Sequence, residues 1–331
     1  MQLDYTYSIT ESIKNHLYQL DVLKKALTLM PPLPHIEENL RRKSLLKSSV
    51  YSARIEGNRL RMEDVENSAF GLRSETKEKM EIANILKAIH WLDSEKTPAV
   101  LSAVLLKNLH GYIMSGLTEE LGKFRQGQSA IFNQAGVAIY MPPPAGELEA
   151  SVDRLINRVN LSKDSGPLKS AYFHFVFEKI HPFLDGNGRV GRLVSAFILK
   201  QTGYDFRSLV SLEEYLENER ERYYYFLNIS SQDITPFVEF FVEGLLIQAE
   251  KAVGNLGKTE KERPEDSLLP RRREILEIIR DQKMVSFDAI KRRFYKVPVS
   301  SIHYDLKQLI KHGFIKKLGI TRGSLYTPAT I

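Results

Sequence analysis

Apolar residues recur at helical spacing on both sides of a glycine-rich turn at residues 186–191. Spacing of this kind predicts an amphipathic helix before the turn and another after it. The turn fits the G-x-G-x-x-G fingerprint of dinucleotide-binding folds, but that fingerprint requires a strand before the glycines and an acidic residue at the end of a second strand. A turn between two helices is therefore predicted in place of a dinucleotide site. The periodic residues are Phe173, Val176, Phe177 and Ile180 before the turn and Val190, Leu193, Val194, Phe197 and Ile198 after it.

The composition indicates a globular protein. Of its 331 residues 43% are hydrophobic and 27% are charged, and cysteine is absent. The absence of cysteine excludes disulfides, thiolate zinc sites and a cysteine nucleophile. The N-terminal residues are acidic and polar where a secretory signal needs a basic start and an apolar run, and no apolar stretch approaches the roughly 18 residues of a membrane helix. We therefore expect a cytoplasmic protein with no membrane segment.

The other patterns predict a mainly α fold that contains one β-hairpin. Residues 122–148 carry several glycines, three consecutive prolines and short β-prone pieces, which predicts a hairpin or flap with a rigid exit. Helices are predicted for residues 147–159, 167–180 and 188–202 and within 218–255. The charged stretch 256–267 lacks apolar anchors and is predicted to be a linker.

The C-terminal part carries the basic excess of the chain. Residues 258–331 hold 17 Lys and Arg against 9 Asp and Glu. Three short helix patterns and two β-like pieces follow the linker, which predicts a small winged helix-turn-helix domain over residues 268–331. Such a domain binds DNA or docks a protein, and no Arg or Asn stands near the start of the expected recognition helix to contact base edges. Arg271, Arg272 and Arg273 form a basic run, and the cations offered for DNA phosphates are Lys291, Arg292, Arg293, Lys316, Lys317 and Arg322.

The turn and its flanks have the residue types of a metal–triphosphate site. Successive N–H groups at a helix N-terminus bind anions, and Arg189 and Arg192, three residues apart, are expected to face the same anion. Asp185 is a hard oxygen ligand suited to Mg²⁺ beside a polyphosphate. His181 has the proton affinity to act as a base at neutral pH. Each residue also has an ordinary structural interpretation, as a helix cap or a solvated cation.

The string HPFLDGNGRVGR at residues 181–192 matches the signature HPFx(D/E)GNGRxxR of the Fic family, whose members transfer AMP from ATP to a protein hydroxyl. The similarity extends over roughly residues 40–250. The segment NLHGYIMSG resembles the helix before the flap, GKFRQGQSAIF and YMPPPAGEL resemble the flap and its exit, and YYYFL resembles the adenine-side helix. This resemblance implies a Fic-type helical bundle with a β-hairpin flap, in which an N-terminal helical region (1–110) precedes the catalytic core (111–255).

The resemblance assigns a role to each residue of the signature. His181 becomes the general base and Asp185 the Mg²⁺ ligand, while Arg192 contacts the γ-phosphate of ATP. The target protein would add an extended segment to the flap. A tyrosine-rich helix is also common in protein cores, which is the alternative for the tyrosines. The implied ATP-binding residues are Gly186, Asn187, Gly188, Arg189, Val190, Gly191, Arg192, Tyr215, Tyr223 and Tyr224, and the implied flap residues are Ser129, Ala130, Ile131 and Phe132.

A second motif lies in residues 49–58, SVYSARIEGN. Ser52 and Glu56 stand four apart on one face of a predicted helix, at about residues 44–57, and Gly57 is placed to end it. The sequence resembles the family's inhibitory motif (S/T)xxxE(G/N), which implies that Glu56 pairs with Arg192 and competes with ATP for this arginine. Without the resemblance, Glu56 is a surface acid before a capping glycine. The same glutamate helps to remove AMP in some relatives, so the reverse reaction is a further expectation.

Two functions are consistent with these patterns. The first is a protein adenylyltransferase that uses Mg²⁺ and ATP on an unidentified target protein or on itself and is inhibited by Glu56. The second is a transcription regulator that senses a nucleotide, binds DNA through its C-terminal domain and catalyses little. The presence of His181 favours the first, because a sensor needs no base. Relatives often form homodimers through the catalytic domain, and this expectation rests on analogy alone.

Overall fold

The computed structural model describes residues 4–30, 34–66, 76–95, 97–132, 138–257, 268–295, 297–319 and 324–329. The chain divides into two compact units, residues 1–257 and 258–331, which are described separately. Most of the predicted linker, residues 258–267 of 256–267, lies outside the described residues. None of the helices in the described ranges is both long and apolar enough to cross a membrane.

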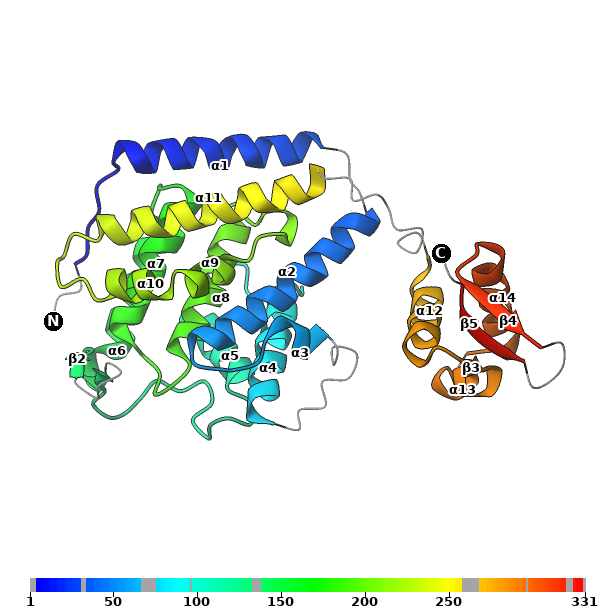
Figure 1. Cartoon of the computed structure of the whole chain (residues 1–331). Coiled ribbons are helices and arrows are strands. Elements are labelled where there is room, and N and C mark those ends of the chain that lie inside the picture. Colours follow the sequence, from blue (N-terminus) through cyan, green and yellow to red (C-terminus); the bar gives the residue numbers. More distant parts are fainter. Residues whose placement is uncertain are drawn as a thin grey trace. The chain divides into compact units, whose positions relative to one another are not determined.

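The first unit is a helical bundle with a small two-stranded hairpin (Figure 1). Its N-terminal helices are α1 (Glu11–Leu29), α2 (Pro34–Ile55), α3 (Met62–Glu66), α4 (Lys77–Leu92) and α5 (Ala103–Ile113). The hairpin, β1 (Ile131–Phe132) and β2 (Ala138–Tyr140), is followed by η1 (Ala145–Glu147), α6 (Leu148–Leu161), α7 (Gly166–Ile180) and α8 (Asn187–Gln201). The unit ends with η2 (Phe206–Ser208), α9 (Leu212–Asn218), α10 (Arg220–Leu227) and α11 (Thr235–Gly257).

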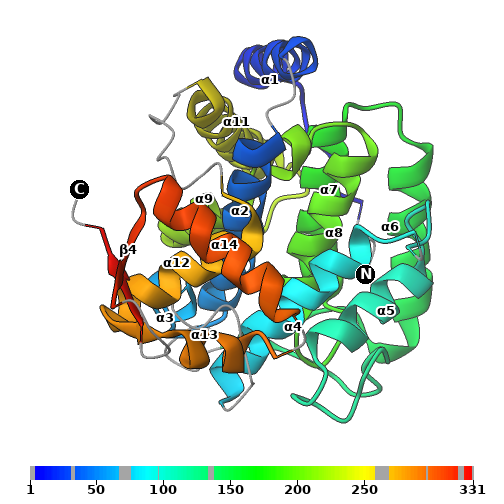
Figure 2. The same cartoon turned by 90° about the vertical axis from the view of Figure 1, so that its right-hand side faces the viewer.

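The two helices predicted around the glycine turn are confirmed as α7 and α8, and they pack on each other at the centre of the unit. Figure 2 shows them with α5 and α6 along one side, while α1 lies beside α11. Burial of the apolar stripes explains the arrangement, since all nine of the periodic residues named above are buried in one core. The predicted hairpin is confirmed as well, with β1 and β2 antiparallel and Ile131 opposite Tyr140.

The region predicted to be helical over residues 218–255 consists of the end of α9 and of two further helices, α10 and α11, separated by residues 228–234. The break follows from turn-forming residues: Asp233 Oδ1 accepts a hydrogen bond from the Thr235 N–H at 2.9 Å, in a turn that leads into α11. The same segment pairs with the N-terminal strand-like residues, since the Ile234 N–H donates to Thr6 O at 2.8 Å. The Asp233 hydrogen bond and the contact with Thr6 therefore interrupt the helix that the apolar periodicity predicts over residues 218–255.

The described residues of the second unit form three helices and a three-stranded antiparallel sheet in the order β3–β5–β4. The helices fall in the expected ranges, and the short strand β3 is an addition that the sequence patterns did not reveal. The designation as a winged helix-turn-helix stays a prediction. The elements are α12 (Pro270–Gln282), β3 (Val285–Ser286), α13 (Phe287–Arg293), α14 (Val299–Lys311), β4 (Ile315–Leu318) and β5 (Leu325–Pro328).

Two arginines of the basic run at residues 271–273 bind a carboxylate inside this unit. The Nε atoms of Arg271 and Arg272 donate to the two oxygens of Asp305, at 2.5 and 2.9 Å. The Asp305 side chain is 1% exposed, so it depends on these cations for its charge balance. Arg271 and Arg272 thereby hold α12 on α14. Arg322 lies outside the described residues.

We predict that Asp305→Ala destabilises the second unit by about 2–4 kcal/mol, because it leaves two arginines without their shared buried partner. Calorimetric unfolding of the full chain measures this as a lowered transition for residues 258–331. Asp281→Ala removes an exposed acid at the end of α12 and is the matched control. Equal unfolding of both variants would contradict a structural role for Asp305.

Candidate active site

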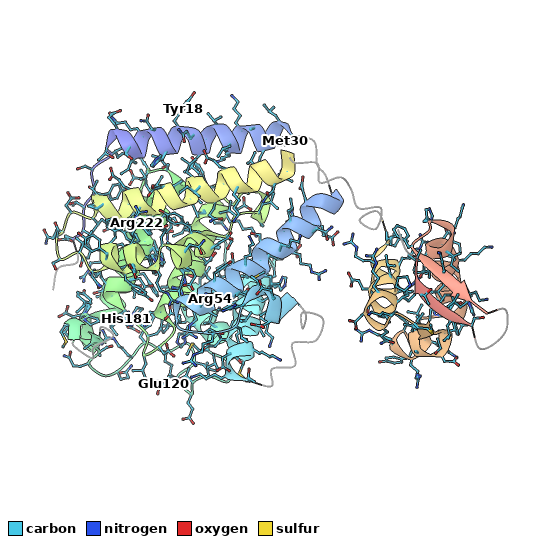
Figure 3. All side chains as sticks on the ribbon, viewed as in Figure 1. Tyr18, Met30, Arg54, Glu120, His181 and Arg222 are labelled. Carbon is cyan, nitrogen blue, oxygen red and sulfur yellow. The ribbon has the colours of Figure 1, made fainter. Side chains whose placement is uncertain are left out.

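His181 lies directly after α7, in the left-handed conformation with φ 49° and ψ 58°, and its N–H donates to Phe177 O at 2.9 Å. The position agrees with the sequence prediction that His181 ends the helix, and Figure 3 labels it near the hairpin. Its Nδ1 is buried and has no hydrogen-bond partner in the described part of the chain. Burial lowers the pKa of His181 below its usual 6.5. The imidazole is therefore neutral at pH 7 and able to accept a proton.

Arg125 joins His181 to both ends of the flap. Its side chain, in a residue only 4% exposed, donates to His181 O at 2.9 Å, to Gly127 O at 2.8 Å and to Pro143 O at 2.5 Å. Its backbone N–H donates to Pro182 O at 2.9 Å. Three nitrogens of the planar guanidinium each donate to one of these carbonyl oxygens. The single amino group of a lysine could not reach all three. No role was predicted for Arg125, because nothing in the neighbouring sequence shows that this arginine is buried.

His110 on α5 contacts the backbone of the turn between α7 and α8. Its Nδ1 accepts a hydrogen bond from the Gly122 N–H at 2.9 Å, so Nε2 carries the proton and donates to Asp185 O at 3.1 Å. The ring stacks on Phe183 at 4.0 Å, and burial lowers the pKa of His110, which favours the neutral ring. The role of His110 was not predicted either. A histidine within a largely apolar helix segment is a weak signal of a buried polar contact.

The turn itself is fixed by short-range hydrogen bonds. Asn187 donates to Phe183 O at 2.8 Å and accepts from the Phe183 N–H at 2.9 Å. Gly186 has φ 80°, and a Cβ there would lie 2.8 Å from Met114 Sδ, so both conformation and space require glycine. The Asn187 side chain therefore holds the loop between Phe183 and Asn187 in its conformation. This role differs from the phosphate contact that was expected of Asn187.

Glu56 and Arg192 form the ion pair that the sequence predicts. Arg192 Nη2 donates to Glu56 Oε1 at 2.8 Å and to Ser52 O at 2.9 Å, and Nε donates to Ser52 Oγ at 3.0 Å. The Arg192 side chain is 2% exposed. Burial opposes its charge, but the Glu56 carboxylate outweighs this effect and raises the pKa of Arg192. The two residues join α8 to the end of α2.

The Glu56 carboxylate also lies against the N-terminus of α8. A Cβ placed on Gly188 would come 2.3 Å from Glu56 Oε1, which locates the carboxylate beside the first turn of the helix. Unpaired N–H groups and the helix dipole favour a negative charge at this place. Glu56 thus occupies a position where the sequence analysis expects a phosphate.

Arg189 uses other partners than Arg192. Its Nη2 donates to Asp185 Oδ1 at 3.0 Å, and its Nη1 lies 3.5 Å from Glu81 Oε1 on α4. The two arginines were expected to face one anion, whereas the structure pairs them with separate carboxylates. Asp185 is 65% exposed. The described residues contain no group of three or more His, Asp or Glu side chains placed to hold a metal, so a metal ion at Asp185 would need ligands from a nucleotide and water.

The three predicted tyrosines do not line one common surface. Tyr223 is buried, and its hydroxyl donates to His174 Nε2 at 2.7 Å. Tyr215 is buried elsewhere and donates to Glu243 Oε2 at 3.1 Å. Tyr224 is 40% exposed and donates to Ile55 O at 3.1 Å, next to the Glu56 turn. Of the three, Tyr224 has the surface that an adenine ring would need.

A buried polar chain lies beneath α8. His174 receives the Tyr223 hydroxyl at Nε2, and its Nδ1 lies 3.2 Å from Ser195 Oγ, which donates to Gly191 O at 2.8 Å. Because the serine proton goes to Gly191, the histidine must carry its own proton on Nδ1. Burial lowers the pKa of His174 to about 3 and keeps the ring neutral. The chain connects α10, α7 and α8 and was not predicted.

The flap lies beside the end of α7. The Tyr140 hydroxyl of β2 donates to Lys179 O at 3.0 Å, and Lys179 Nζ lies 4.5 Å from the centre of the Tyr140 ring. Ser129 and Ala130 are partly exposed before β1. The side chains of Ile131 and Phe132 and residues 133–137 lie outside what the structure describes.

Residues 100–199 match the Fic/DOC family. Among curated proteins, the chain is 34% identical over 128 residues to the protein adenylyltransferase Fic of Drosophila persimilis and 33% identical over 128 residues to that of Drosophila willistoni. Each alignment covers 38% of this chain and 23% of the relative, so the chain matches less than a quarter of the length of these proteins.

Solved structures share the fold over most of the chain. A Fic family protein from Desulfovibrio desulfuricans has a TM-score of 0.69 with 24% identity and covers 97% of both chains. Fic-1 from C. elegans, residues 134–508, has a TM-score of 0.63 with 18% identity and covers 75% of this chain and 73% of that one. The chain has the Fic fold, and the part that matches the Fic/DOC family model is residues 100–199.

We predict that Arg125→Leu loosens the flap, because the carbonyls of Gly127, Pro143 and His181 lose their donor. The cost is about 3 kcal/mol, which corresponds to roughly a hundredfold faster hydrogen exchange at both ends of the flap. Lys123→Leu replaces an exposed neighbour and is the control. If both variants exchange at the wild-type rate, the Arg125 contacts do not hold the flap.

Proposed function

We propose that this chain is a protein adenylyltransferase that transfers AMP from ATP to a hydroxyl side chain of a protein, and that Glu56 restrains it. The observation that carries the proposal is the position of the Glu56 carboxylate, on the N-terminus of α8 and hydrogen-bonded to Arg192. Such a position attracts phosphate for the same electrostatic reasons. The matched family and the names of the curated relatives support the same reaction.

In this proposal His181 takes the proton of the target hydroxyl while the hydroxyl oxygen attacks the α-phosphorus of ATP and pyrophosphate leaves. The N–H groups at the start of α8, from Asn187 and Gly188, hold the phosphates, and Arg192 holds the terminal one after Glu56 has moved away. Asp185 would bind Mg²⁺, which neutralises phosphate charge. The flap presents the target segment, and alignment together with charge stabilisation lowers the barrier.

Inhibition follows from competition for one guanidinium. While Glu56 holds Arg192, the terminal phosphate of ATP meets a carboxylate in place of a cation. Ser52 strengthens the inhibited arrangement because its Oγ and O both accept hydrogen bonds from Arg192. The reverse reaction, removal of AMP from a target, would use the same residues and remains part of the proposal.

We predict the following incorporation of α-labelled ATP into this protein or into lysate proteins: weak for the wild type, strong for Glu56→Gly and none for Glu56→Gly/His181→Ala. Removal of a general base lowers rates by about 10²–10⁴-fold. Glu63→Gly changes an exposed acid on the neighbouring α3 and should label as weakly as the wild type. Equal labelling with and without His181 would sink the mechanism.

The pH dependence gives a second prediction. Burial lowers the pKa of His181 below 6.5, and loss of Glu56 removes a carboxylate that raises it. The base therefore stays neutral as the pH falls through 6.5, so labelling by Glu56→Gly at ATP concentrations far below saturation, where the rate reports the free enzyme, should decline only at lower pH. Initial rates between about pH 5 and 8 measure this. An acid limb centred above pH 6.5 is the opposite result.

A second candidate function is a nucleotide-responsive DNA-binding regulator. It is favoured by exposed cations on α13, α14 and β4, namely Lys291, Arg292, Arg293, Lys307, Lys311, Lys316 and Lys317. DNA binding through these residues would weaken steeply as the salt concentration rises. A gel shift of the full chain across salt concentrations distinguishes the functions, because His181→Ala abolishes labelling without changing a regulator's affinity for DNA.

A further inference from the structure

A cavity of about 100 Å³ lies behind Arg192, between α2, α4, α8 and α9. It follows the part of α8 from Arg192 to Lys200 and so lies on the C-terminal side of the glycine turn. Its walls are mainly apolar, and they include Leu45, Ile89, Leu193, Phe197, Leu212 and Leu216. Apolar walls of this kind favour an apolar occupant over water.

One part of the lining is polar. Glu213 of α9 contributes a buried carboxyl group, and Ser48 of α2 contributes a hydroxyl. Burial raises the pKa of Glu213, and a carboxyl group accepts hydrogen bonds in either protonation state. A neutral ligand hydroxyl satisfies such a group without bringing a second charge into the interior.

The volume limits the ligand. An apolar cavity of about 150 Å³ holds benzene, so about 100 Å³ suits a similar or slightly smaller group with its remainder in the open mouth. At the mouth of the cavity, Lys200 and Asp93 form an ion pair, and their two charges cancel. Size, apolar walls and a polar end that accepts a hydrogen bond together describe a small alcohol or a monocyclic phenol.

The cavity is completed by the helix that carries the inhibitory residues. Leu45 and Ser48 of α2 line it, and the same helix continues to Ser52 and ends just before Glu56. Two ion pairs hold α2 on α9, Lys47 with Glu214 at 3.1 Å and Arg54 with Glu217 at 3.1 Å. Displacement of α2 from this place would open the cavity and separate Glu56 from Arg192 together.

We propose that this cavity is a binding site for a small neutral alcohol or phenol, and that its occupation holds α2 in place and strengthens inhibition. A ligand that binds the docked arrangement more tightly than the displaced one shifts the equilibrium toward the docked arrangement. The regulatory part rests on the proposed inhibition by Glu56. Binding itself does not.

Binding is tested with 4-fluorophenol by ¹⁹F NMR titration of the full chain. Ala196 lies on α8, lines the cavity and is exposed, so Ala196→Leu adds bulk at the cavity without entering the packed core. Ala150→Leu makes the same change on the exposed side of α6. We expect at least tenfold weaker binding for Ala196→Leu and unchanged binding for Ala150→Leu. Equal binding by both variants, or no binding by the wild type, overturns the site.

Regulation has two further readouts. Hydrogen exchange of residues 44–57 should slow several-fold when 4-fluorophenol saturates the wild type, and it should not slow in Ala196→Leu. The ligand should also lower labelling by the wild type but not by Glu56→Gly. Binding without these effects overturns the regulatory part alone. If no variant labels any protein, the proposed function fails, while the NMR titration and the exchange measurement still decide the inference.

Discussion

The arrangement of the first unit depends on the charge of Arg192. A guanidinium enclosed between helices must have an anionic partner, because an unpaired buried charge costs several kcal/mol. Here the partner comes from α2, more than a hundred residues earlier in the chain, so one ion pair sets how this helix meets α8. Any anion that takes over Arg192 must therefore compensate for the loss of Glu56.

The main helices, the hairpin and the ion pair of the first unit could be predicted from the sequence. The apolar period of 3.6 residues defines α7 and α8, and turn residues define the hairpin. The family resemblance identified Glu56 and Arg192 as partners, which no local pattern could do. Asn187 was predicted to contact phosphate, whereas its hydrogen bonds to Phe183 depend on backbone geometry that only the folded loop supplies.

The residues that escaped prediction act through long-range contacts. Arg125 finds its carbonyl partners at residues that include His181 and Pro143, and His110 finds one at Asp185. Sequence spacing carries no trace of such contacts, since they arise only after the helices pack. The same reason applies to Arg271 and Arg272, whose basic run indicated an external partner while the buried Asp305 supplied an internal one.

The hydrogen bonds donated by the Arg125 side chain connect both ends of the flap to the backbone of His181. A protein segment that added itself to the flap would pair through backbone groups, and these carry no information about side chains. Selection by such a surface acts on chain geometry, so it favours loops and termini that already run extended and disfavours hydroxyls on helices. For the proposed reaction, the range of substrates would then be decided by how a target displays its backbone more than by which residues surround the modified one.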